Sequence, residues 1–232
     1  MMFGIDPLYW IMMLPVLLLS MWASLRVKSA FKKYSEISTQ SGISGAQAAK
    51  MILRGNGLGH IPVEDVSGFL SDHYDPVKRV LRLSPEVYRN STIAAIGVAA
   101  HETGHALQHA RNYRPLMLRT MIAPTASIGS NLAWIIIVFG FIINSLGLVK
   151  IGILLFSVVV VFQLITLPVE LNASARAQQA LAAGGYATSA EMAGVRKVLS
   201  AAALTYVAAA ASAIVTLLYF LVRAGMFGGS DE

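Results

Sequence analysis

The residues best suited to chemistry form a His-Glu-x-x-His segment that begins at His101. Residues four apart lie on one face of an α-helix, so His101 and His105 can place two imidazole nitrogens on one zinc ion. The carboxylate of Glu102 lies beside them, where it can take a proton from a water molecule whose pKa the zinc lowers. Glu102 can then give that proton to the leaving amine of a peptide bond. The spacing therefore predicts one catalytic zinc ion, with Glu102 as the general base.

The surroundings of the motif favour this interpretation over a histidine pair that only fills a packed core. The motif lies on a predicted helix, where Gly104 leaves room for another part of the chain to approach closely. The chain contains no cysteine, so disulfides and thiolate zinc sites are both excluded. Any metal must then be held by histidine and carboxylate ligands.

A catalytic zinc ion needs a third protein ligand and an open position. The metzincin pattern would place glycine and histidine three and six residues after His105, but the chain has Gln108 and Arg111 there. His109 shares the helix face, yet eight residues of helix put it about 12 Å along the axis from His101. One ion with bonds of about 2.0–2.1 Å cannot join both. His109 is therefore expected at the surface or beside a ligand.

Glu170 is the favoured third ligand because it stands at the end of an apolar block, where an acid is costly unless it is paired or bound to metal. Two predicted membrane crossings separate it from His105, so it returns to the same side of the membrane. The alternative is a carboxylate at a helix end that pairs with Arg176. His60 and His73 are further candidates, which could line a substrate cleft or lie in exposed loops.

Two supporting roles are also predicted, each with less specific signals. Asn172 follows Glu170 on the same helix and could accept the second N–H of a ligating histidine. The negative charge that develops on a scissile carbonyl could be stabilised by His73, Tyr74 or Arg79, and no signal selects one of them.

The elements that must position these residues include membrane spans. The chain is 56% hydrophobic and 13% charged, which is more apolar than an ordinary soluble domain. The apolar residues fall into blocks of the length that crosses about 30 Å of hydrocarbon as a helix. The blocks are Leu8–Leu25, Met121–Ile143, Leu148–Val169 and Ala201–Val222.

The basic residues predict the orientation of these spans. No Lys or Arg precedes the first block, which favours a retained anchor over a secretory signal. Thirteen of the eighteen basic residues lie between Arg26 and Arg119, and three more lie between the third and fourth blocks. The positive-inside rule then places both termini outside the cell membrane and the motif in the cytoplasm. The formal charge of +6 is explained by this topology, so no nucleic-acid partner is needed.

The predicted fold class is a mainly α integral membrane protein with about four transmembrane helices and a small α+β, zincin-like cytoplasmic domain. Its parts are an N-terminal anchor, a cytoplasmic metallopeptidase domain, a transmembrane hairpin, a cytoplasmic helical segment with the third ligand, and a C-terminal transmembrane helix and tail. They are assigned to residues 1–25, 26–120, 121–169, 170–200 and 201–232.

Within the cytoplasmic part, local patterns predict several elements. Apolar residues recur near helical spacing at Val27, Phe31, Tyr34 and Ile37, which indicates either a basic helix on the membrane surface or a solvated flank. Ser44 can cap a helix that ends near Gly55. Two strands, at 61–70 and 79–83, are expected to form a hairpin around a turn at 71–76. A helix is expected from residue 93 to about residue 111.

Four segments resemble the YugP-like membrane zinc metallopeptidases, namely Asp72–Pro76, Arg79–Ser84, Ala94–Glu102 and Pro168–Glu170. The order of metal helix, transmembrane hairpin and acidic ligand is also similar to that of HtpX-like and CAAX prenyl membrane endopeptidases. The resemblance implies zinc at His101, His105 and Glu170, in a gluzincin-like set, and Glu102 as the base. Where that family commonly has Asp, this chain has Asn172, which removes a charge from the surroundings of the metal.

These observations predict an endopeptidase that cuts membrane or membrane-associated proteins near the cytoplasmic face. A non-catalytic membrane scaffold with a zinc-stabilised fold is the alternative. It draws slight support from Asn172, but a purely structural site would need no base at Glu102. A metal transporter would need polar ligands near the bilayer midplane, where Asn131, Asn144 and Gln163 are weak candidates. The partners expected are a protein substrate and the lipid bilayer, and the sequence leaves open an oligomer or a regulatory membrane partner.

Overall fold

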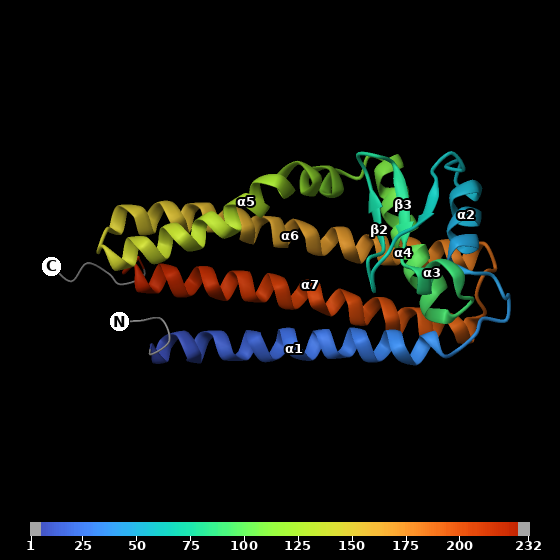
Figure 1. The fold of residues 1–232 in the computed structure, drawn as a ribbon, viewed down its shortest axis with the longest axis horizontal. Coiled ribbons are helices and arrows are strands. Elements are labelled where there is room, and N and C mark those ends of the chain that lie inside the picture. The colour runs from blue at the N-terminus through green and yellow to red at the C-terminus, as the bar shows by residue number, and fades with distance from the viewer. Residues whose placement is uncertain (1–5, 227–232) are drawn as a thin grey trace. The chain divides into compact units, whose positions relative to one another are not determined.

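The computed structural model describes residues 6–226, and these form long helices and one small sheet (Figure 1). The helices are α1 (Pro7–Ser35), α2 (Gly45–Gly55), α3 (Pro85–Arg89), α4 (Ile93–Ala110), α5 (Arg114–Ile142), α6 (Leu146–Ala183) and α7 (Ser189–Arg223). The strands are β1 (Val63–Asp65), β2 (His73–Asp75) and β3 (Val80–Leu83).

The four long helices α1, α5, α6 and α7 are each long and apolar enough to cross a membrane. Each predicted apolar block lies inside one of them, except that Ile143 follows the last residue of α5, so the mainly α membrane fold with a small sheet is confirmed. The helices continue well beyond the apolar blocks. The 38 residues of α6 correspond to about 57 Å of helix, nearly twice the thickness of the hydrocarbon layer. One helix can therefore contribute both a span and residues outside the bilayer.

The chain divides into two compact units, and the long helices contribute to both. The sheet unit comprises Ser24–Leu116 and Pro168–Leu204, and the rest of the described chain forms the helical unit. The boundary within α6 falls between Leu167 and Pro168, so Glu170 belongs to the sheet unit. All residues of the predicted zinc site therefore lie in one unit.

In the helical unit, α5 and α6 form the close antiparallel pair that the predicted transmembrane hairpin requires (Figure 1). A Cβ atom at Gly152 would lie 3.1 Å from the nitrogen of Ile137 and 3.2 Å from the carbonyl oxygen of Ala133. Only a residue without a side chain allows the two backbones to approach so closely. The termini, predicted to lie outside the cell, include residues 1–5 and 227–232, which are outside the described residues.

The sheet has the order β1-β3-β2, with β1 parallel and β2 antiparallel to β3. The prediction of a hairpin between 61–70 and 79–83 was therefore wrong, because these segments pair in parallel. The expected turn instead contains β2. The chain reverses only after Asp75, whose carboxylate accepts the backbone N–H groups of Val77 and Lys78, each at 2.9 Å. These local hydrogen bonds make the turn shorter than the run of turn-forming residues suggested.

Helix α4 forms the buried centre of the sheet unit and packs against α2, α3, β2 and β3. Its small side chains, including the fully buried Ala94, Ala99 and Ala100, allow these elements to approach closely. Helix α2 begins as predicted, because the Ser44 side chain accepts the N–H of Gln47 and the Gln47 side chain accepts the N–H of Ser44.

The basic segment after the first apolar block continues α1 to Ser35. Phe31 and Tyr34 are buried in the hydrophobic core of the sheet unit. These two apolar residues therefore pack against the protein rather than on a membrane surface, whereas Lys28, Lys32 and Lys33 are exposed, as the solvated flank predicts.

Candidate metal centre

The candidate metal centre is built from two helices of the sheet unit. Helix α4 carries His101, Glu102 and His105, and the sheet-unit part of α6 carries Glu170. The helices approach closely at Gly104, where a Cβ atom would lie 2.5 Å from the carbonyl oxygen of Ala173. The glycine inside the motif therefore lets α6 come near enough to bring its carboxylate to the two histidines.

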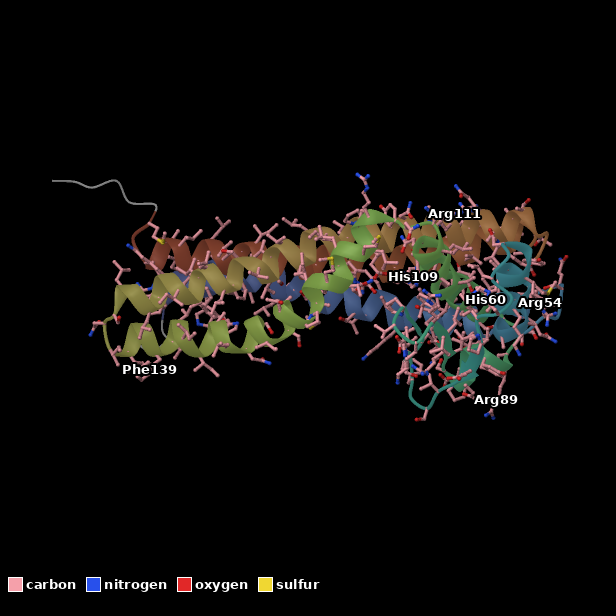
Figure 2. All side chains as sticks on the ribbon, turned by 90° about the horizontal axis from the view of Figure 1, so that it is seen from above. Arg54, His60, Arg89, His109, Arg111 and Phe139 are labelled. Atoms are coloured by element: carbon pink, nitrogen blue, oxygen red, sulfur yellow. The ribbon has the colours of Figure 1, made fainter. Side chains whose placement is uncertain are left out.

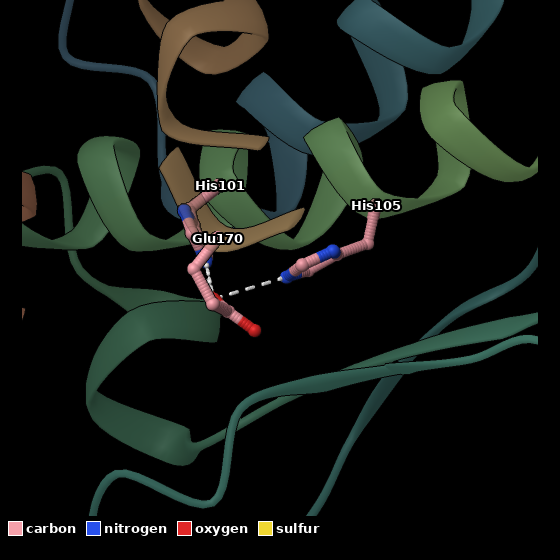
Figure 3. A group of neighbouring side chains, drawn as sticks. All are labelled: His101, His105 and Glu170. Carbon is pink, nitrogen blue, oxygen red and sulfur yellow. Dashed lines mark hydrogen bonds and ion pairs between the residues drawn. The ribbon is translucent and has the colours of Figure 1, made fainter. Parts of the chain in front are cut away.

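Three side chains converge on one point (Figure 3). The Nε2 atom of His101 lies 3.1 Å from Oε2 of Glu170, and Nε2 of His105 lies 3.5 Å from the same oxygen. The ligand atoms of the three residues all lie within 4.8 Å of one another. The two imidazole rings meet edge to face, with their centroids 4.9 Å apart. This cluster could hold a metal ion.

The environment of the ligand atoms fits a divalent metal. Glu170 is only 2% exposed, and a carboxylate so buried requires positive charge or hydrogen-bond donors around it. Imidazole nitrogen and carboxylate oxygen are ligands that zinc prefers, and three of them leave a position open. The ligand types of this cluster therefore fit a divalent metal ion such as zinc.

Each histidine uses its other ring nitrogen in a hydrogen bond. Nδ1 of His101 lies 3.1 Å from the hydroxyl of Ser174, and Nδ1 of His105 lies 3.0 Å from Oε1 of Gln108. Because the Gln108 oxygen can only accept, His105 carries its proton on Nδ1, which leaves the lone pair of Nε2 for a metal. The partners therefore orient both rings toward Glu170.

Gln108 has a role that the sequence analysis missed. It is fully buried, and its amide nitrogen donates to the carbonyl of Val169 at 2.8 Å and to Oδ1 of Asn172 at 3.0 Å. The side chain thereby ties His105 on α4 to the turn of α6 that contains Glu170. Its position three residues after His105 was the signal that could have identified it.

The sequence analysis expected Asn172 to accept the second N–H of a ligating histidine. In the structure, Ser174 and Gln108 contact these ring nitrogens instead. The Oδ1 atom of Asn172 accepts hydrogen bonds from Gln108 and from Nε of Arg176, the latter at 2.7 Å. Both contacts use an oxygen acceptor, which asparagine and aspartate share. The asparagine at this position therefore keeps the hydrogen bonds and lacks only the charge. Arg176 binds Asn172, whereas the alternative interpretation paired it with Glu170.

Glu102 is 9% exposed and is held by the sheet. Its Oε2 accepts the backbone N–H of Tyr74 in β2 at 3.0 Å. Burial raises the pKa of the nearby Asp72 carboxyl, and the charge of Glu102 adds to this effect, although hydrogen bonds from Ser84 oppose it. Strand β2 thus positions the carboxylate that the sequence analysis predicted to be the base.

The remaining candidates take different places. A cavity of about 310 Å³ lies beside β2 and is lined by His60, Tyr74, Arg79 and His109, of which Figure 2 labels His60 and His109. His109 contacts the Tyr74 hydroxyl through Nδ1 at 2.9 Å, and burial raises the pKa of that hydroxyl. His73 is exposed, and its Nδ1 contacts the backbone carbonyl of Ser71 at 2.8 Å. None of the three histidines is part of the metal cluster.

Replacing Gly104 with alanine is expected to destabilise the sheet unit by about 1–3 kcal/mol, the usual cost of overpacking. An exposed Gly→Ala change in a helix would instead stabilise it by roughly 0.5–1 kcal/mol. The new methyl group would meet the backbone of Ala173, which cannot move without displacing α6. Denaturant unfolding of the purified protein measures the change.

Gly55→Ala is the matched control, because a Cβ atom there meets nothing within 4 Å. A Gly104→Ala protein as stable as the Gly55→Ala protein would contradict the close contact between α4 and α6.

Comparison with known proteins adds two matches. The model of a family described as "Putative neutral zinc metallopeptidase" matches residues 9–225. A Bacillus subtilis (strain 168) protein described as "Putative membrane protease YugP" is 51% identical over 214 residues, which cover 92% of this chain and 94% of that protein. No solved structure matches.

Proposed function

Since the chain belongs to the zinc metallopeptidase family whose model spans it, we propose that it is an endopeptidase acting on membrane or membrane-associated proteins near the cytoplasmic face. The observation that carries this proposal is the convergence of His101, His105 and Glu170 on one point, with Glu102 on the same helix. The four candidate spans support an enzyme embedded in the membrane.

The proposed roles follow from the contacts of each residue. His101, His105 and Glu170 hold the metal, and the hydrogen bonds of Ser174 and Gln108 keep the imidazole rings in place. When bound, zinc supplies Lewis acidity, which lowers the pKa of a water molecule toward neutrality and polarises a carbonyl group.

Glu102 moves the proton in this mechanism. The N–H of Tyr74 holds one carboxylate oxygen, which leaves the other to take a proton from the attacking water. The oxygen of that water bonds to the carbonyl carbon, and the carboxylic acid then returns the proton to the amine as the peptide bond breaks. Tyr74 contacts Glu102 through its backbone N–H, and Arg79 lines the same cavity as Tyr74, so these two are the candidates that stabilise the developing oxyanion.

Metal removal tests the proposed activity directly. The protein purified in detergent is expected to contain about one zinc ion and to cleave an unfolded model protein such as casein. Dialysis against a chelator should abolish cleavage, because the three ligands alone supply no Lewis acid. Addition of one equivalent of zinc should restore it. Cleavage that persists after zinc has been removed would contradict the proposal.

The orientation with the sheet unit in the cytoplasm is part of the proposal and rests on the distribution of Lys and Arg. The absence of cysteine allows a single-cysteine test. Val77→Cys places a thiol at a residue that is 84% exposed in the sheet unit, and Ser145→Cys places one in the α5–α6 connection. In intact cells, a membrane-impermeant maleimide should label only the cysteine at position 145. Labelling of the cysteine at position 77 in intact cells would show that the sheet unit lies outside the cell and would contradict the proposed orientation.

A further inference from the structure

A second cavity in the sheet unit has a composition unlike that of the metal centre. It has a volume of about 320 Å³ and is lined by residues from α2, α4, the end of α6 and the segment after it. Its walls are partly apolar, with Ile52, Leu107 and Ala180, and two arginines, Arg111 and Arg176, face it. The volume is at the lower end of the range for small-molecule sites.

The two arginines make this cavity positively charged. Burial lowers the pKa of the Arg176 guanidinium, and the charge of Arg111 lowers it further. No Asp or Glu lines the cavity, and no ion pair joins either arginine to an acid within residues 6–226. Two neighbouring cations without a counter-charge are unfavourable unless water or an anion compensates them.

Arg176 is held in a fixed position before any ligand binds. Its Nε donates to Asn172 at 2.7 Å, and its guanidinium lies over the ring of Tyr113, 5.8 Å from the centroid. Asn172 is in turn held by the buried Gln108. The Nε contact leaves the two terminal nitrogens of Arg176 with their N–H groups for a further acceptor. Such a fixed fork loses little entropy when it binds an oxyanion.

The cavity is separate from the metal centre. Leu107 follows His105 by two residues, which turns it about 200° around α4. On α6, Gln179 follows Glu170 by nine residues, or two and a half turns, and so faces the opposite side of that helix. The cavity shares no residue with the three-residue cluster. A ligand bound there would not be the peptide at its cleavage point.

We propose that this cavity binds a phosphate group, held between Arg111 and Arg176. A phosphate dianion would compensate both positive charges, and its several oxygens can accept from two guanidinium groups at once. The apolar walls and the volume leave room for a small organic part next to the phosphate. The source of the group is either a soluble phosphate compound or the headgroup of an anionic lipid.

Isothermal titration calorimetry of the full-length protein in detergent tests this site. The two probes are inorganic phosphate and dihexanoyl phosphatidic acid, measured at constant ionic strength so that general charge attraction does not change. Arg111→Gln is expected to weaken binding by about tenfold or more, the effect of losing one charge-assisted hydrogen bond. Arg111 is the better position to change, because Arg176 also holds Asn172.

Arg54→Gln is the matched control. This arginine is exposed on α2 and does not line the cavity, and Figure 2 labels it together with Arg111. Wild type and Arg54→Gln should bind with the same affinity. Tighter binding of phosphatidic acid than of phosphate would favour a lipid headgroup as the source of the group, and comparable binding would favour a soluble phosphate compound. Equal affinities of Arg111→Gln and Arg54→Gln, or the absence of saturable binding of both probes to wild type, would overturn the proposal.

Discussion

Replacing Glu102 with glutamine is expected to abolish peptide hydrolysis while zinc stays bound. The amide cannot take a proton from water, and general-base catalysis alone contributes about 10²–10⁴-fold to a rate. The amide oxygen can still accept the N–H of Tyr74, so the side chain keeps its position. Zinc content measured together with the rate of casein cleavage separates loss of the base from loss of the metal.

Glu86→Gln provides the control for this change. Glu86 is an exposed carboxylate in α3 of the same unit, and its replacement should leave both zinc content and rate unchanged. Cleavage by Glu102→Gln at the wild-type rate would exclude Glu102 as the base. A zinc-loaded wild type without any activity would instead favour the scaffold.

Replacing Glu170 is expected to remove zinc from the protein. Loss of one of three ligands should lower zinc affinity by well over about a hundredfold, because even hydrogen-bond partners of ligands contribute about 10–100-fold. Glu170→Ala also leaves a hole at a site that is 2% exposed, so Glu170→Gln is the more informative variant. The glutamine preserves the volume and can contact the imidazoles but lacks the carboxylate charge. Zinc content after dialysis against a weak chelator measures the effect.

His60→Gln is the corresponding control among the histidines outside the cluster. His60 lines the cavity beside β2, and its replacement should leave zinc content unchanged. If Glu170→Ala retained zinc and His60→Gln lost it, the assignment of Glu170 as the third ligand would be wrong. Circular dichroism of every variant checks that the protein is folded when its zinc content is measured.

Asn172 illustrates how a single departure from a family pattern can be judged from contacts. The sequence alone indicated a missing charge beside the metal. The structure places Oδ1 of Asn172 between the Gln108 amide and the Arg176 guanidinium, where a neutral oxygen is sufficient as an acceptor. The hydrogen bonds that hold His105 through Gln108 are therefore present with asparagine at this position. They give no reason to expect that the asparagine abolishes activity.

The sequence by itself determined the features that depend on short spacing and on composition. The four-residue separation of His101 and His105 requires only a helix, and the apolar blocks require only the thickness of a bilayer. The expected association of Glu170 with the motif came from counting membrane crossings. Each of these inferences holds without knowledge of which faces of the helices meet.

Only the tertiary structure decided the contacts between elements distant in the sequence. The parallel pairing of β1 with β3, the hydrogen bond from Tyr74 to Glu102 and the bridge from Gln108 to Asn172 all depend on the rotation and spacing of packed elements. A polar side chain such as Gln108 has no periodic signature of its own, because its partner lies 64 positions away along the chain. Local patterns therefore predicted the reacting groups, and close packing at Gly104 decides how the predicted metal ligands are held.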